Sequence, residues 1–441
     1  MRRIAVSFVL FALLLTGPRA VADEPRPPNF LVLIADDMGW HDIGYHDSDI
    51  RTPELDKLAK SGVRLERHYV CTTCSPTRAG LLTGRNPSRY GILGPIGDRS
   101  TLSLPLDTAT LPRVLKTRGY ATALSGKWHL GLRPEVGPRK YGFDQTYGYL
   151  HGQIDPYTHR YKNGDRTWHR NDEFIDEKGH ATDLITDDAV RFLSAERKEP
   201  FFLYVAFSVP HHPLQEEDKF VAPYRETIKD PSRRLYAASI AHLDASVGRI
   251  VAALEKTGQL KNTLILFTSD NGGQRDYNSK TEYEGKYGPL PTLGDNRPWR
   301  GWKGELYEGG IRVPAFVHWQ GRLKPEELGH TVSYLDWYPT FAKLAGVNIE
   351  AAWKLEGRDV WPLMTGAVRK PAKTTLYWNT PAATSVIDGD WKLIVSKRKA
   401  ESVELYNLAY DHEEKTDRAV ENPKKVEELR KVLAEQKKLD P

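Results

Sequence analysis

The chain has 441 residues and a formal net charge of +5, with 63 Lys and Arg residues against 58 Asp and Glu residues. This length can bury a large core, and the mild, evenly spread charge argues against a dedicated nucleic-acid-binding or membrane-surface protein. With only two cysteines, no framework of long-range disulfides holds the fold.

The first 22 residues have the features of a secretory signal peptide. A basic start, Met1-Arg2-Arg3, precedes an apolar run at 4–17 that is too short to span a bilayer comfortably. Small residues at 20–22 provide a cleavage site, so we expect cleavage after Ala22 and a secreted or periplasmic protein. An uncleaved membrane anchor is the alternative. We expect no later segment to cross a membrane.

Strands and helices are predicted to alternate along most of the chain. Short runs rich in Val, Ile, Leu and Phe, each ending in polar residues, predict buried strands within 29–37, 121–131, 201–213 and 262–273. Helical patterns lie between them or before them, at 53–62, 108–120, 183–197 and 232–258. This alternation predicts an α/β fold with a large, mostly parallel sheet flanked by helices on both sides.

A second region is predicted from residue 357 to the end. Segments 374–380, 385–396 and 403–408 have the pattern of short antiparallel strands, and 422–439 that of a closing amphipathic helix. We therefore divide the mature chain into a catalytic domain at 23–356 and a small α+β subdomain at 357–441.

Polar residues with related chemistry follow the four predicted strands. In open α/β sheets, ligands bind outside the carboxyl ends of the strands, so these residues are expected to meet. Three carboxylates and one amide oxygen suit Ca²⁺ or Mg²⁺ rather than zinc. A cluster of cations beside a divalent metal suits a small dianion such as sulfate or phosphate. The oxygen donors at the strand ends are Asp36, Asp37, Asp270 and Asn271, and the cationic or histidine side chains there are Lys127, His129, His211 and His212. We expect Arg78 and Lys303 to converge on the same edge from other segments.

Both cysteines, Cys71 and Cys74, lie in the short stretch CTTCSPTRAGLLTGR. A redox pair, half of a metal site and a nucleophile in an anion pocket are the three alternatives. The first two are weak, because no strand-to-helix redox context and no further cysteine accompany the pair. Pro76 favours a helix start, which would place Cys74 at a helix N-terminus, where the thiol pKa is expected to fall, with Arg78 one turn later.

The chain resembles the type I sulfatases, most closely the arylsulfatase B-like branch that acts on carbohydrates. The segment CSPTRAGLLTGR matches the sulfatase signature, and LIADDMGW, GKWHLG, SVPHHPLQ, TSDNGG and RGWKGELYEGGIRVP match further motifs in order. The resemblance extends through GDWKLI and ELYNL near the C-terminus and covers nearly the whole mature chain. It implies an alkaline-phosphatase-like α/β sandwich with a small C-terminal antiparallel sheet and helix.

The resemblance also implies a mechanism. A separate maturing enzyme would convert Cys74 to Cα-formylglycine, whose hydrated aldehyde attacks sulfur and later expels sulfate, and Cys71 would be a spectator. Asp36, Asp37, Asp270, Asn271 and position 74 would bind one Ca²⁺, with Mg²⁺ as an alternative. Arg78 and His129 would orient the nucleophile, with His129 as base. Lys127, Lys303 and His211 would hold the sulfate, with His211 as proton donor; His212 is the alternative to His211.

Two rival functions and the substrate remain open at this point. A phosphatase or phosphodiesterase would share the sheet, and a non-catalytic sulfated-glycan binder would use the cations without maturation of Cys74. Segments 148–170 and 282–302 are rich in aromatic and polar residues that suit sugar rings. We expect N-acetylgalactosamine 4-sulfate at the end of a chondroitin or dermatan-type glycan as substrate, with another sulfated polysaccharide or an arylsulfate as alternative.

Overall fold

The computed structural model describes residues 26–398 and 402–441. The predicted signal peptide at 1–22 lies outside the described residues. Within them the chain forms a ten-stranded sheet and a four-stranded sheet. The predicted α/β fold with a second, smaller sheet is confirmed.

The large sheet has the strand order β10-β2-β9-β8-β1-β7-β3-β4-β5-β6. The four strands predicted from the apolar runs, β8, β1, β7 and β3, are neighbours at its centre and run parallel. Strands β5, β6 and β9 run antiparallel to their neighbours. The strands are β1 Asn29–Ala35, β2 Val63–Tyr69, β3 Ala121–Lys127, β4 Gln145–Tyr149, β5 Trp168–Arg170, β6 Glu173–Phe174, β7 Phe201–Ala206, β8 Thr263–Ser269, β9 Ala315–His318 and β10 Glu326–Ser333.

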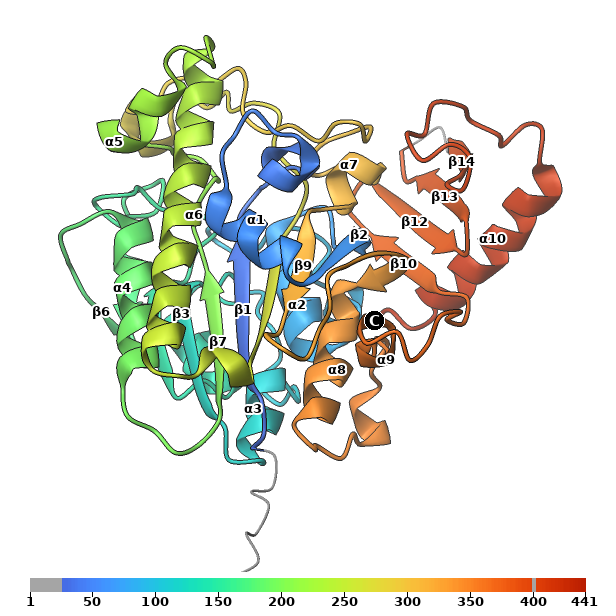
Figure 1. The fold of residues 1–441 in the computed structure, drawn as a ribbon. Helices are drawn as coiled ribbons and strands as arrows, with labels where there is room; N and C mark the ends of the chain where they lie inside the picture. The colour runs from blue at the N-terminus through green and yellow to red at the C-terminus, as the bar shows by residue number, and fades with distance from the viewer. Residues whose placement is uncertain (1–25, 399–401) are drawn as a thin grey trace, which may run out of the picture.

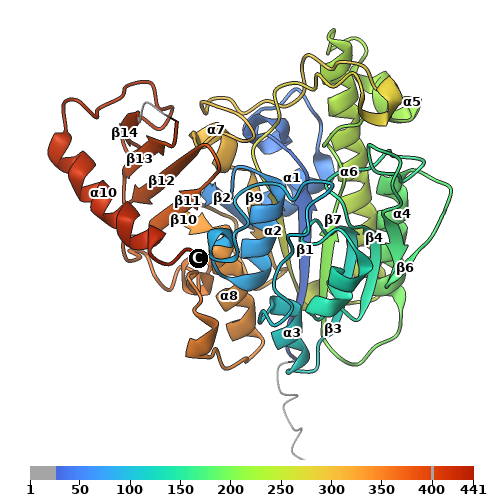
Figure 2. The same ribbon diagram turned by 180° about the vertical axis from the view of Figure 1, so that it is seen from behind.

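Helices cover both faces of this sheet because its central strands are apolar on both sides. In β1, Leu31 and Leu33 pack on one face, whereas Phe30 and Val32 pack on the other. Helices α1, α4 and α6 cover the first face (Figure 1), and α2, α3 and α8 cover the second (Figure 2). The helices are α1 Pro53–Lys60, α2 Cys74–Thr83, α3 Leu111–Lys116, α4 Ala181–Ser194, α5 Asp218–Val221, α6 Pro231–Lys256, α7 Glu308–Ile311, α8 Trp337–Leu344, α9 Trp361–Met364 and α10 Pro423–Lys437.

Helix α6 corrects one expectation from the sequence. Among the described residues it is the one helix long and apolar enough to cross a membrane by length and composition, although no such segment was expected after the leader. Its most apolar stretch is 72% buried, as in a core helix of the large domain.

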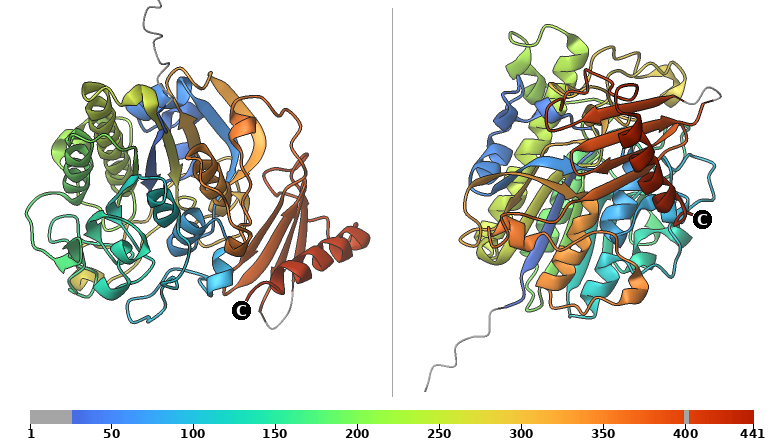
Figure 3. Two further views of the ribbon diagram at one scale, coloured as in Figure 1. Left: turned by 90° about the horizontal axis from the view of Figure 1, so that it is seen from below. Right: turned by 90° about the vertical axis from the view of Figure 1, so that its right-hand side faces the viewer.

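The C-terminal strands form an antiparallel sheet in chain order, β11 Thr375–Asn379, β12 Ala383–Asp388, β13 Trp391–Ser396 and β14 Val403–Asn407. Helix α10 packs on its outer side and the large domain on its inner side (Figure 3). Val360 and Met364 belong to the core of the large domain, and the small sheet begins only at Thr375. The boundary at residue 357 stays a prediction.

Candidate active site at the strand ends

Cys74 is the first residue of α2 and is 3% exposed. Thr73, in an extended conformation, precedes the helix, so Cys74 lies in its first turn, where main-chain N–H groups have no acceptor within the helix. The helix packs closely in the fold, since a Cβ at Gly80 would lie 2.0 Å from the Tyr334 ring. The predicted helix start is therefore present, and it places Cys74 at a buried helix N-terminus.

His129 faces this position with a defined tautomer. Its Nδ1 lies 3.1 Å from Cys74 Sγ, and its Nε2 lies 3.0 Å from the main-chain oxygen of Ile96. A carbonyl oxygen only accepts hydrogen bonds, so Nε2 carries the proton and the Nδ1 lone pair faces position 74. His129 also has a φ of 55°, a left-handed conformation that is unfavourable for a non-glycine residue and is typical of functional positions.

The predicted oxygen donors meet at the ends of β1 and β8. Ala35 is paired with Ser269, so Asp36 and Asp37 emerge beside Asp270. Ligand atoms of these three carboxylates all lie within 4.8 Å of one another, and all three side chains are buried. Asp36 Oδ1 and Asn271 Oδ1 are buried and accept no hydrogen bond from any described residue. These open oxygen acceptors in a group of carboxylates fit a hard divalent cation.

Three cations reach the same carboxylates. Arg78 donates from Nη2 to Asp270 Oδ2 at 2.7 Å and from Nη1 to the Lys127 main-chain oxygen at 3.2 Å. Lys127 Nζ lies 2.6 Å from Asp36 Oδ2, and Lys303 Nζ lies 2.7 Å from Asp37 Oδ2. The structure thus brings together all the predicted cations. We call the strand-end cluster the set Asp36, Asp37, Arg78, Lys127, Asp270, Asn271 and Lys303.

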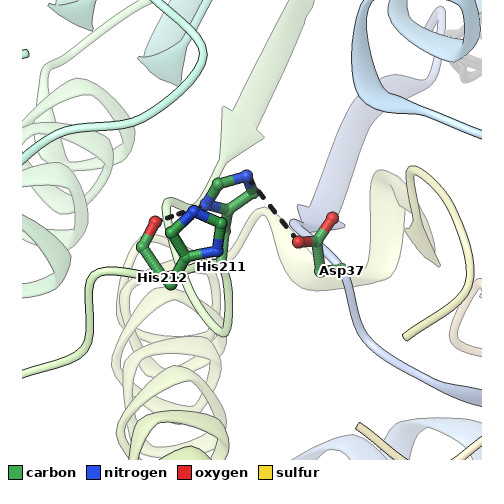
Figure 4. A group of neighbouring side chains, drawn as sticks. All are labelled: Asp37, His211 and His212. Atoms are coloured by element: carbon green, nitrogen blue, oxygen red, sulfur yellow. Dashed lines mark hydrogen bonds and ion pairs between the residues drawn. The ribbon is translucent and has the colours of Figure 1, made fainter. Parts of the chain in front are cut away.

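The two adjacent histidines differ in orientation. His211 Nε2 lies 3.7 Å from Asp37 Oδ2, and its Nδ1 donates to the main-chain oxygen of His212 (Figure 4). The His212 ring instead stacks on Tyr277, with ring centroids 4.0 Å apart. His211 therefore faces the strand-end cluster, and His212 lies between His211 and the Tyr277 ring.

The pKa of the Cys74 thiol departs from the sequence-based expectation. Burial raises this pKa, and the positive charges of Lys127 and Lys303 only partly offset the effect. The lowering expected from the helix N-terminus alone was wrong, because burial was not visible in the sequence. Burial lowers the pKa of His129 and of His211 well below the ordinary value, and neighbouring lysines add to this effect, so both imidazoles are neutral near pH 7.

Cys71 has a different environment. Both cysteines are free, and the Cys71 thiol donates to the Tyr334 hydroxyl at 3.0 Å. Burial raises the pKa of Cys71 to about 12. A thiol that stays protonated and buried is unreactive, which argues against the redox-pair interpretation.

Comparisons with known proteins show the family of this chain. The family model described as Sulfatase matches residues 28–347, which include the whole strand-end cluster, and a model of the N-sulphoglucosamine sulphohydrolase C-terminal region matches residues 300–439. The chain belongs to the sulfatase family. The sulfatase fold and the resemblance drawn from the motifs are thereby confirmed.

Relatives of this sulfatase include enzymes that hydrolyse sulfuric esters. It is 36% identical to mouse arylsulfatase J over 85% of this chain and 62% of that protein, so it spans less than two thirds of that relative's length. It is 33% identical to mouse N-acetylgalactosamine-6-sulfatase over 78% of this chain and 67% of that protein. Among solved structures, Ps i-CgsB matches with a TM-score of 0.85 and 32% identity over 94% of each chain. The same protein in complex with k-i-k-neocarrahexaose matches with a TM-score of 0.84 and 31% identity, again over 94% of each chain.

Two supporting contacts of the sulfatase site were not predicted from the sequence. The Ile96 carbonyl fixes the tautomer of His129, and the Tyr236 hydroxyl donates to the main-chain oxygen of Asp37 at 2.8 Å. A main-chain carbonyl carries no sequence signal, and Tyr236 lies within the apolar pattern of α6. Both contacts depend on tertiary structure alone.

Proposed function

We propose that this protein hydrolyses sulfate esters of carbohydrates, with Cys74 converted to Cα-formylglycine and Ca²⁺ as the metal. The observation that carries the proposal is the convergence on position 74 of a helix N-terminus, the His129 lone pair, three carboxylates and three cations. Sulfated-carbohydrate relatives support the substrate class: one is named N-acetylgalactosamine-6-sulfatase, and Ps i-CgsB is known in complex with a neocarrahexaose.

Asp36, Asp37, Asp270 and Asn271 would hold the metal together with position 74. Asp36 Oδ1 and Asn271 Oδ1 are buried acceptors without a hydrogen-bond partner among the described residues, as expected of oxygens that bind a cation. When bound, Ca²⁺ supplies positive charge that stabilises the negative oxygens of the reacting sulfate group. Mg²⁺ is the alternative, because the same hard oxygen ligands suit both ions.

The formylglycine supplies the nucleophile through its hydrated aldehyde, and the residues of the chain position it and move protons. His129, with its Nδ1 lone pair toward position 74, is the base. Arg78 is fixed by Asp270 and the Lys127 carbonyl and so orients the nucleophile. A base held within hydrogen-bond reach in a single tautomer lowers the barrier of proton transfer.

Lys127, Lys303 and His211 would bind the sulfate. Both lysines already point into the cluster, and each ammonium pairs with one carboxylate there. Charge-assisted hydrogen bonds to a dianion are about twice as strong as neutral ones. His211 is the proposed proton donor to the leaving oxygen because it, rather than His212, faces Asp37. Its Nδ1–H is engaged by the His212 carbonyl, so it would donate from Nε2 after taking up a proton, which the negative charge of a bound sulfate ester favours.

The exact sulfate position remains a proposal. The motifs favour N-acetylgalactosamine 4-sulfate, whereas the names of the relatives add a 6-sulfate and a carrageenan-type sugar as alternatives. A maturing enzyme is the proposed partner, because formylglycine formation requires it. A signal peptide at 1–22 and export belong to the same proposal.

The test is hydrolysis of defined esters by protein produced together with a sulfatase-maturing enzyme. The panel contains 4-nitrophenyl sulfate, 4-nitrophenyl phosphate, chondroitin disaccharides sulfated at O4 or O6, and a sulfated neocarrabiose. We expect sulfate release from at least one sugar and no phosphate release. Phosphate release without sulfate release would establish the phosphatase alternative instead.

A further inference from the structure

One carboxylate beside the active site is shared by side chains from two loops far apart in the sequence. Glu282 Oε1 lies 2.9 Å from Lys162 Nζ. Glu282 Oε2 accepts hydrogen bonds from Gln153 Nε2 at 3.1 Å and from the Tyr277 hydroxyl at 3.0 Å. The Lys162 and Glu282 side chains are 30% and 23% exposed, so this group is held firmly and still reaches solvent.

This group adjoins His129, which faces position 74, and His212. The Tyr277 ring, whose hydroxyl contacts Glu282, stacks on His212 at 4.0 Å and 24° between ring planes. On the other side, Gln153 follows Gly152, where a Cβ would lie 2.6 Å from Cε1 of His129. The group around Glu282 therefore lies at the edge of the active site, and not on a remote surface.

The backbone after Glu282 is held in an unfavourable conformation. Tyr283 and Glu284 have φ values of 54° and 57°, and Gly285 follows with 77°. Consecutive non-glycine residues in the left-handed region persist only where surrounding contacts hold them, and they concentrate at functional sites. One such contact is the Tyr283 N–H, which donates to the Lys162 carbonyl at 2.9 Å. The turn thus fixes the Glu282 carboxylate against Lys162.

We propose that Glu282 and Lys162 form a subsite that binds hydroxyl groups of the sugar ring carrying the sulfate ester. This inference rests on the proposed sulfatase function and extends it to the recognition of the sugar. A carboxylate accepts about four hydrogen bonds, and protein donors supply three, so Glu282 retains an acceptor position for a sugar O–H. The Lys162 ammonium retains N–H groups that donate to a neighbouring sugar oxygen.

An acceptor beside a donor is complementary to two adjacent hydroxyl groups of a pyranose. Lys162 Nζ lies 5.6 Å from the centre of the Tyr161 ring, and this ring is tilted by 35° against His151, with ring centroids 4.5 Å apart. The cation is therefore held against an aromatic ring that is itself packed in place. An aryl sulfate has no such hydroxyl groups. The subsite therefore distinguishes sugar sulfates from aryl sulfates at the same catalytic centre.

The experiment compares Glu282→Gln with Glu284→Gln, a matched control in the same turn whose side chain is exposed. Both variants and the parent protein are assayed on the best sugar sulfate of the panel and on 4-nitrophenyl sulfate. We expect Glu282→Gln to lower kcat/KM on the sugar about 10- to 100-fold, mainly through KM, because a hydrogen-bonded hydroxyl loses its charged acceptor. Activity on 4-nitrophenyl sulfate should change less than about twofold, and Glu284→Gln should change neither.

Equal losses on both esters would overturn the proposal, since they would indicate that Glu282 supports the catalytic histidines instead. No loss on either ester would also overturn it. A binding measurement separates this result from failure of the proposed function. If the parent protein hydrolyses no sulfate ester, calorimetric titration with the same disaccharides decides: binding weakened by Glu282→Gln supports the subsite, and absence of binding contradicts it.

Discussion

The loop from β7 to α5 contributes side chains to two buried groups. In one group the pKa of a histidine is lowered, and in the other it is raised. At its start, His211 faces the strand-end cluster, where burial and the charges of Lys303 and Lys127 lower its pKa. At its end, Glu216 lies 2.8 Å from His242 of α6 in a group that we call the helix clamp, formed by His180, Asp183, Glu216 and His242. There burial alone would lower the pKa of His242, but Asp183 and Glu216 outweigh it and raise the pKa to about 9.

The difference shows how a buried binding site can be told from a buried structural contact. In the helix clamp, His180 accepts from the Thr182 N–H at Nδ1 and donates from Nε2 to the Gln215 carbonyl, so no lone pair of its ring is left for a metal. His242 lies between two carboxylates as a cation. Glu216 Oε1 of the clamp is also a buried acceptor without a hydrogen bond, but it lies 3.7 Å from the protonated Nε2 of His180. The strand-end cluster instead combines two open oxygen acceptors with converging cations, which leaves it able to bind ligands. Residue types alone do not make this distinction.

The largest effect on activity is expected when Cys74, and not Cys71, is replaced. Cys74→Ala should lower sulfatase activity by at least about 1000-fold, because it removes the nucleophile, while the unfolding temperature stays close to that of the parent. Cys71→Ala is the control and should keep activity within a few-fold, because the Cys71 thiol donates to the buried Tyr334 hydroxyl and its main-chain N–H, which alanine keeps, donates to Thr77 Oγ1. Unchanged glycan binding together with unchanged activity in Cys74→Ala would favour the non-catalytic alternative.

Metal removal should affect the strand-end cluster and leave the helix clamp intact. Dialysis against EGTA should abolish activity and lower the free energy of unfolding by about 2.7 kcal/mol relative to protein with free Ca²⁺ about 100-fold above its Kd. Added Ca²⁺ should restore both. A His242→Gln variant should respond to Ca²⁺ like the parent protein; loss of the Ca²⁺ response in that variant would place the metal in the clamp.

The adjacent histidines should differ in their contribution to turnover. His211→Asn should lower kcat by about 100-fold, as expected for loss of a proton donor, whereas His212→Asn should lower it less than about tenfold. The reason is their orientation, with His211 toward Asp37 and His212 against Tyr277. Steady-state kinetics on 4-nitrophenyl sulfate measure both, and the reverse order would transfer the proposed role to His212.

The smallest effect on activity is expected for a substitution in the helix clamp, which should instead change the stability of the fold. The folded-state pKa of His242 is raised from 6.5 to about 9, so its contribution is fully present below pH 6.5 and is lost as the pH rises toward 9. His242→Gln should therefore lose about 3 kcal/mol of stability at pH 6 and converge on the parent near pH 9 and above. Urea unfolding at several pH values measures this, and a stability difference that does not depend on pH would contradict the charged state of His242.

Much of the fold and site was predictable because the signals are local. The apolar runs identified β1, β3, β7 and β8, and residues at the ends of β1, β3 and β8 supply most of the strand-end cluster, whereas Arg78 comes from α2 and Lys303 from a later loop. The strand order was not predictable, since it depends on which strands pair after folding. The burial that raises the pKa of Cys74 was not predictable either, because it depends on tertiary structure. The contact between Lys162 and Glu282 joins residues 120 positions apart, although both segments had been expected to line the substrate site.

The central claim is that position 74 is a matured nucleophile, and the most direct measurement is the mass of the tryptic peptide His68–Arg78. The protein should come from a host that matures other sulfatases, and its activity on the ester panel should be measured on the same sample. We predict the mass of the formylglycine form, with Cys71 unmodified. A peptide with both thiols intact, from a sample that still hydrolyses sulfate esters at full rate, would contradict the account.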